Sequence, residues 1–220
     1  MDKAGRVWQA MAALMLCGVT LGVQAKVDDE LPNSKKWYIG FGLTSGTFFG
    51  AHYESKGVKN DFEDWTQHDG KIGYQNFVNF GAGYVLNSKW RVGLDTSIVL
   101  FENKTAYATS PDIARSINLN ELSLVTHYFP MTNSFFLRAG VGISQLKLST
   151  TNTNNDNSNE NVDQQSNGLG AVVGVGYAFQ LSNNFNISVN LDHRRQNYGA
   201  DNNKPEHSAY TIAFLGFNWH

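Results

Sequence analysis

Apolar residues recur at every second position over long stretches of the chain. In residues 168–180 glycine fills most of the places between apolar residues. In residues 185–192 asparagine, serine and aspartate alternate with phenylalanine, isoleucine, valine and leucine. A two-residue period is typical of a β-strand with one apolar and one small or polar face. The pattern predicts eight strands, over residues 37–45, 74–86, 90–101, 116–129, 135–148, 168–180, 185–198 and 208–219.

The predicted connections alternate in length. Tight turns are expected at 87–89, 130–134 and 181–184, whereas the connections near 46–73, 102–115, 149–167 and 199–207 are long and polar. Antiparallel strands in chain order would place all short turns at one end and all long loops at the other. This is the arrangement of an outer-membrane up-and-down barrel, with short periplasmic turns and long extracellular loops.

Aromatic residues gather near the short-turn end of the predicted strands. They are Trp37, Tyr84, Trp90, Tyr128, Phe129, Phe135, Tyr177, Phe179, Phe185, Phe217 and Trp219. Aromatic rings favour the membrane–water boundary, because one edge of the ring is apolar and the other tolerates water. A general preference of aromatic residues for strands does not explain why they crowd at one end. The sequence therefore predicts an all-β fold, an eight-stranded antiparallel up-and-down transmembrane β-barrel.

The N-terminal segment has the features of a cleaved secretory signal peptide. Lys3 and Arg6 form a basic head, an apolar stretch follows, and small residues end at Ala25. A lipoprotein signal is not expected, because Leu16 rather than a small residue precedes Cys17. The expected organisation is a signal peptide over 1–25, a periplasmic lead-in over 26–35, and a barrel over 36–220 with four long extracellular loops.

Cleavage after residue 25 would change the composition in two ways. The mature chain would hold 15 basic and 18 acidic residues, since one acidic and two basic residues are lost, giving a net charge near −3. This argues against nucleic acid as a partner. The only cysteine would also be lost, so no disulfide and no thiolate metal site are expected.

Alternation assigns the apolar face to lipid and the small or polar face to the interior. An eight-stranded barrel is only wide enough for its interior to be filled by side chains, so no open pore is expected. Buried charges need partners, and the inward charges are therefore expected to form ion pairs; a proton or ion path is the alternative. These lumen residues are Arg91, Asp95, Glu121, Arg138, Asp192 and Arg194.

Three cationic residues face outward by the same alternation. Lys147, Arg195 and His193 lie toward the long-loop ends of their strands, at the expected level of lipopolysaccharide phosphates. Cations bind phosphate through charge-assisted hydrogen bonds. Ordinary snorkelling or solvation above the bilayer explains the same positions equally well.

No enzymatic site is expected. Asp192 and His193 are neighbours on a strand, so their side chains point to opposite faces. Some eight-stranded barrels that deacylate lipid A use a lipid-facing histidine with a serine two residues on, and resemblance to them would put the serine where this chain has Arg195. His52 and His68 do not form a metal-ligand pattern with nearby acids, and no metal or cofactor is predicted.

Two long loops differ in character. The connection near 149–167 is almost free of apolar residues and is expected to be mobile. The connection near 46–73 carries aromatic residues, of which Phe48, Phe49 and Trp65 are candidate binding anchors. The alternatives are that these aromatics pack on one another or extend the first two strands above the membrane.

Several segments resemble the small eight-stranded outer-membrane proteins of Gram-negative bacteria, the OmpA transmembrane-domain, OmpX/Ail and opacity-type group. The segments are WYIGFGL, FGAGYVLNSKWRVGLD, LSLVTHYFP with FFLRAGVGISQ, and FLGFNWH. The resemblance implies the outer membrane as location, and lipid, lipopolysaccharide and the barrel assembly machinery as partners. Most members end on an aromatic residue, whereas here Trp219 is followed by His220.

Members of this group include adhesins, serum-resistance factors, structural proteins and a few lipid-modifying enzymes. The leading hypothesis is a non-enzymatic barrel of structural or surface-interaction type, whose loops contact a host or matrix ligand and whose lumen has no open pore. The alternative is a small transport or sensing barrel with a gated lumen. A lipid A-modifying enzyme is a third, weaker hypothesis.

Overall fold

The computed structural model describes residues 37–45, 48–62, 74–103, 113–130, 134–152, 159–199 and 204–220. The predicted signal peptide, its cleavage site and the lead-in therefore lie outside the described residues, as do Trp65 and His68. The strands are β1 Trp37–Ser45, β2 Phe48–Ser55, β3 Val58–Asp61, β4 Tyr74–Val85, β5 Trp90–Asn103, β6 Ile113–Tyr128, β7 Phe135–Asn152, β8 Asn159–Ser182, β9 Phe185–Asn197 and β10 His207–Trp219.

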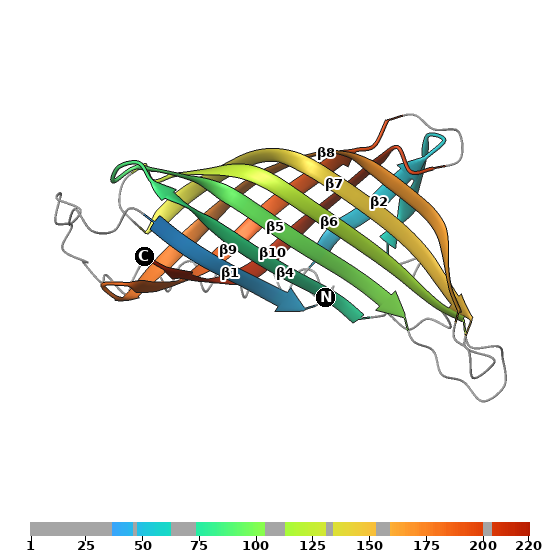
Figure 1. Cartoon of the computed structure of the whole chain (residues 1–220), viewed down its shortest axis with the longest axis horizontal. Coiled ribbons are helices and arrows are strands. Elements are labelled where there is room, and N and C mark those ends of the chain that lie inside the picture. The colour runs from blue at the N-terminus through green and yellow to red at the C-terminus, as the bar shows by residue number, and fades with distance from the viewer. Residues whose placement is uncertain are drawn as a thin grey trace, which may run out of the picture.

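Eight of these strands close into an antiparallel barrel. The order is β1-β4-β5-β6-β7-β8-β9-β10, and β10 pairs back onto β1 (Figure 1). A row of paired residues that leaves β8 at Leu169 and passes once around the barrel returns to β8 at Phe179, ten residues along. This stagger goes with strands tilted by about 35–45° from the barrel axis. The predicted fold class is confirmed.

Among the described residues, no helix is both long enough and apolar enough to span a membrane.

The short hydrogen-bonded turns explain why adjacent strands pair locally. Between β4 and β5 the Asn87 side-chain oxygen accepts hydrogen bonds from the backbone N–H groups of Lys89 and Trp90, both at 2.9 Å. Asparagine stabilises turns by this local bonding. The turn between β8 and β9 holds only two residues, Asn183 and Asn184. These turns lie at the end of the barrel where the chain finishes (Figure 1).

The connection near 46–73 contains regular structure. Along β10, β1 pairs with the segment from Leu215 to Trp219 and β2 pairs with the segment from His207 to Ile212, so β2 continues the line of β1. A β-bulge interrupts the β2–β10 pairing, and Gly50 has a φ of 59° there, a value that favours glycine. β3 then folds back on β2 as a hairpin. Of the two alternatives for the loop aromatics, the structure shows both, because β2 extends the line of β1 and the ring centroids of Tyr53 and Phe62 lie 6.0 Å apart.

The connection near 149–167 is also shorter than predicted. β7 continues to Asn152 and β8 begins at Asn159, and the two strands remain paired through this region. The expectation of an irregular loop over 149–167 was therefore wrong for residues 149–152 and 159–167, which lie in β7 and β8, whereas its expected mobility stays a prediction. Polar residues can form the tip of a two-stranded ribbon in water because pairing satisfies their backbone groups.

The predicted facing of the strands is confirmed, and that of β10 is now defined. On β10 the side chains of Tyr210, Ile212 and Phe214 are buried inside the barrel, whereas Leu215 and Trp219 are exposed on the outer face. Outward rings near the short turns pack in pairs across strands. The ring centroids of Trp37 and Tyr84, Trp90 and Tyr128, and Phe185 and Trp219 lie 5.2, 4.6 and 4.9 Å apart.

The long-loop end of the lumen is apolar, which the alternation of strands did not predict. We call this buried set the upper apolar cluster. Its members are Phe48, Ala51, Tyr53, Phe62, Phe77, Val99, Phe101, Ile117, Leu119, Leu146, Leu148, Tyr210, Ile212 and Phe214. The Phe101 ring lies at its centre, 4.8 Å from the ring of Phe48 and 5.1 Å from that of Phe62. The hairpin thus contributes aromatic side chains that close the barrel from above.

Candidate functional site: the barrel interior and the outer rim

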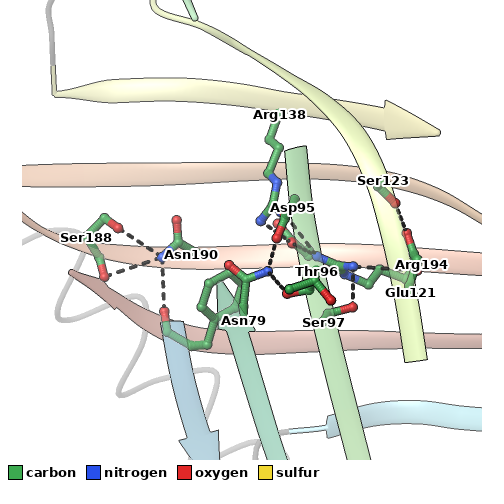
Figure 2. A network of polar contacts seen from close by, with 12 residues as sticks. Asn79, Asp95, Thr96, Ser97, Glu121, Ser123, Arg138, Ser188, Asn190 and Arg194 are labelled. Atoms are coloured by element: carbon green, nitrogen blue, oxygen red, sulfur yellow. Dashed lines mark hydrogen bonds and ion pairs between the residues drawn. The ribbon is translucent and has the colours of Figure 1, made fainter. Parts of the chain in front are cut away.

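Below the upper apolar cluster lies a network of five buried charged side chains. Arg138 pairs with Asp95 and donates to Asp192 Oδ2 at 2.8 Å. Arg194 lies beside them and also reaches Glu121 (Figure 2). The five side chains come from β5, β6, β7 and β9, and each is at most 6% exposed. The structure brings together five of the six residues of the predicted lumen charge network.

Arg194 is the side chain with the most partners in this network. Its guanidinium donates to Ser97 Oγ at 2.8 Å and lies 3.2 Å from Asp192 Oδ2, 3.5 Å from Glu121 Oε2 and 3.7 Å from Asp95 Oδ2. The same group stands 5.7 Å from the centre of the Phe77 ring. The arginine therefore links three carboxylates to the lower surface of the upper apolar cluster. The network as a whole holds three carboxylates and two guanidinium groups.

Neutral polar groups satisfy the remaining acceptors. Glu121 accepts hydrogen bonds from Ser123 and, at 3.0 Å, from Gln196 Nε2. Gln196 Oε1 accepts from Ser208 Oγ at 2.8 Å, and Ser208 contacts the hydroxyl of Tyr198. Burial raises the pKa of the Tyr198 hydroxyl, which lies beyond the end of β9, so this group stays protonated at neutral pH.

Small residues make room for the network. A Cβ atom added at Gly174 would collide with the Asp192 carboxylate on the neighbouring strand. The glycine-rich inner face of β8 is explained in this way, since its partner strand β9 carries the long charged side chains that the narrow interior must accommodate.

Arg91 does not belong to the network. It lies near the short-turn end, where its guanidinium stacks 4.5 Å from the centre of the Phe129 ring and lies 3.5 Å from Nε2 of His220. His220 Nε2 also accepts a hydrogen bond from Asn186 Nδ2 at 2.7 Å. Among the described residues no carboxylate pairs with Arg91. The sequence could not separate Arg91 from the other inward charges, because the position of a residue along its strand does not show which side chains of other strands lie opposite it across the lumen.

The three outward cationic residues do not form one group. Lys147 faces Asn118 and Gln165, whereas Arg195 faces Ala171 six residues further along β8. Six residues correspond to about 20 Å along a strand. Lys147 is therefore separate from the other two.

His193 and Arg195 of β9 lie near two histidines of other strands, His52 of β2 and His207 of β10, that sequence reasoning did not connect to them. Arg195 faces Ala209 of β10, and Ala209 in turn faces His52 of β2. His193 Nδ1 lies 3.0 Å from the Thr211 hydroxyl, and alternation places His207 outward beside buried Ser208. We call His52, His193, Arg195 and His207 the outer cationic group. Only the pairing of β2 with β10 reveals it.

The outer cationic group lies at the upper edge of the lipid-facing surface. Arg195 lies ten residues above Phe185 on β9. With a rise of ~3.3 Å per residue and a tilt of about 40°, this corresponds to a height of about 25 Å. The apolar band of an outer-membrane barrel has about the same height.

Two predicted features of the site require correction or restriction. Phe48 is only 8% exposed and belongs to the upper apolar cluster, so it is wrong as an exposed binding anchor. Phe49 is half-buried on β2, and Trp65 lies outside the described residues.

Asp192 is buried in the network while His193 is exposed on the outer face, as strand geometry predicted. Within the residues that the structure describes, no cluster of three metal-ligating side chains occurs.

A family model described as outer membrane protein beta-barrel domain matches residues 11–217. No curated protein sequence matches the chain.

Solved structures with a similar fold include three outer-membrane proteins. Neisserial surface protein A is 15% identical, with a TM-score of 0.47, over 83% of this chain and 96% of that one. Ail of Yersinia pestis, in complex with the heparin analogue sucrose octasulfate, is 12% identical with a TM-score of 0.47 over the same shares. OprG of Pseudomonas aeruginosa is 16% identical, with a TM-score of 0.36, over 84% of this chain and 96% of that one.

Proposed function

Because the chain belongs to the outer membrane protein β-barrel family, we propose that it is a structural or surface-contact protein of the Gram-negative outer membrane, with a closed lumen. In this role the barrel anchors the protein in the membrane. The β2–β3 hairpin and the long-loop ends of the strands face the cell exterior, where they contact a host or matrix surface. No catalytic residue is assigned.

The observation that carries this proposal is the filling of the lumen in two successive layers. The charge network is buried, with Arg194 and Asp192 each 1% exposed. Above it the rings of Phe101 and Phe62 are 1% and 0% exposed. An ion that displaced the ion pairs would still meet the upper apolar cluster, whose only polar side-chain groups are the hydroxyls of Tyr53 and Tyr210. A gated transport barrel would have to rearrange both layers.

Conductance in planar lipid bilayers tests the closed lumen. The purified, folded protein is expected to give no stable open-channel steps in salt solution at moderate voltage, because both layers exclude hydrated ions. A general porin measured in the same bilayer serves as the positive control. Regular conductance steps from this protein would support the gated transport alternative and contradict the proposal.

We further propose that the outer cationic group contacts phosphate groups of lipopolysaccharide. The support is its height at the upper edge of the apolar band and the exposure of His193 and Arg195 on the outer face. Asp61 faces His52 across the hairpin, so Arg195 is expected to supply most of the attraction. Charge-assisted hydrogen bonds to phosphate are the relevant interaction.

Replacing Arg195 by glutamine is expected to weaken binding of lipopolysaccharide to the detergent-folded protein about tenfold, the equivalent of one charge-assisted hydrogen bond. The measurement is a titration with lipopolysaccharide followed by calorimetry. Lys89→Gln, at an exposed position in the opposite, periplasmic turn, is the matched control and should bind like wild type. Equal affinities for both variants would reject the contact.

A further inference from the structure

The periplasmic half of the lumen holds a cavity of about 60 Å³. Its walls come from the short-turn ends of the strands, and the Asp95–Arg138 pair borders it from above. A water molecule needs about 10–15 Å³ by this measure, so the cavity has room for about four. A small organic acid of four heavy atoms occupies similar space.

Two buried donors around this cavity have no partner in the structure. The Tyr38 hydroxyl and the Nε of Arg138 make no hydrogen bond, although both side chains are only 6% exposed. Buried polar groups are normally satisfied, and those that are not call for a missing water or ligand. Both groups belong to residues that line the cavity.

A cation completes the set at the periplasmic side of the cavity. The guanidinium of Arg91 lines it and has no carboxylate partner among the described residues. The charge network holds one more carboxylate than guanidinium groups. This extra negative charge offsets the positive charge of Arg91, but the network provides no hydrogen-bond acceptor for it. Arg91 therefore presents donors and a positive charge to anything that enters from the periplasm.

Two acceptors that border the cavity are already engaged. Asp95 is bound by Arg138 and Asn79, and Nε2 of His220 is bound by Asn186. The unoccupied groups include the two donors of Tyr38 and Arg138 and also Nδ1 of His127, a ring nitrogen that can donate or accept, and they surround a space of small-molecule size. This pattern suits a ligand that carries negative charge on oxygen acceptors, and it does not suit a cation.

We propose that this cavity is a periplasm-facing binding site for a small oxygen-bearing anion, such as a carboxylate. Arg91 supplies the charge and a hydrogen bond, and the Tyr38 hydroxyl supplies a second hydrogen bond. The charge network and the upper apolar cluster close the route to the exterior, so the anion enters and leaves on the periplasmic side. The site goes beyond the proposed surface role and does not depend on it.

The test is a titration of the folded, ¹⁵N-labelled mature chain in detergent with sodium acetate at constant ionic strength. The arginine Nε–Hε signals are followed by NMR, and the Arg91 signal is identified from the Arg91→Gln spectrum. We expect the Arg91 signal to shift saturably at millimolar acetate. Acetamide, which has the same shape without the charge, should leave it unmoved.

Variants separate a defined site from general anion attraction. Tyr38→Phe should weaken the affinity for acetate at least about threefold, since one neutral hydrogen bond is worth about 1 kcal/mol. Arg195→Gln, on the outer face, should bind acetate like wild type. If Arg91→Gln fails to fold, the wild-type titrations with acetate and acetamide and the acetate affinity of Tyr38→Phe still test the proposal.

The proposal is overturned by any of three results. They are a linear, non-saturating shift, an equal response to acetamide, or a Tyr38→Phe affinity indistinguishable from wild type. Because the titration detects no transport, its outcome is independent of the bilayer conductance that tests the closed lumen.

Discussion

Replacing Arg194 by methionine is expected to lower the free energy of unfolding of the barrel by about 3–5 kcal/mol. The guanidinium contacts Glu121, Asp192 and Asp95 in a fully buried environment. Methionine fills much of the volume but leaves these carboxylates with a single guanidinium between them. The stability falls mainly because buried carboxylates are left without a partner, and less because their attraction to Arg194 is lost.

The measurement is urea unfolding in lipid vesicles, followed by the heat-modifiable band on unboiled gels. Arg195→Met is a closely matched control, because it is the next residue on the same strand and faces outward; its effect should stay below about 1 kcal/mol. Adding Glu121→Gln to Arg194→Met should restore part of the stability, because one orphaned charge is removed. Equal losses for the two arginine variants would show that the network carries no such role.

Replacing Phe101 by alanine is expected to destabilise the barrel by about 3–5 kcal/mol. The ring is 1% exposed and packs on Phe48 and Phe62, so its removal leaves a cavity that the rigid barrel wall cannot close. The same unfolding experiment measures the effect. It also tests whether the β2–β3 hairpin is held in place by its aromatic contacts.

Phe80→Ala is the control for Phe101→Ala. Phe80 is 50% exposed on the outer face, where lipid fills the vacated space, so only the transfer free energy of the ring is lost, about 1.5–3 kcal/mol. The difference between the two variants is the cavity contribution. A loss at Phe80 equal to or larger than that at Phe101 would contradict the packing of the upper lumen.

The barrel strands could be predicted because lipid and lumen impose opposite demands on alternate residues. The first predicted strand, 37–45, coincides with β1, and the outward Ile39 and Leu43 follow the pattern. The pattern failed where both faces are apolar. Val99 is an inward residue of the upper apolar cluster, and the apolar residues Ile98 and Leu100 beside it obscure the period. Ile117 is also inward but has Ser116 and Asn118 beside it, so there the period is clear and its apolar face points into the lumen.

The composition of the site could be predicted better than its connections. All five network residues were identified as inward-facing, but the separation of Arg91 depends on the ten-residue stagger of the closed barrel. This stagger decides which side chains of different strands meet inside the barrel. The outer cationic group was missed for a similar reason, because it requires β2 to pair with β10 beyond the end of β1. Neither relation leaves a local signal in the sequence.

The upper block of the lumen and the proposed periplasmic access to the cavity are tested together by the reactivity of single cysteines toward a water-soluble maleimide, because residues 26–220 contain no native cysteine. In the folded protein Asn218→Cys, which lines the cavity, should react almost as fast as exposed Asn87→Cys. Val99→Cys should react only after unfolding. Rapid reaction of Val99→Cys in the folded barrel would mean that water passes the apolar layer, and the closed lumen would have to be abandoned.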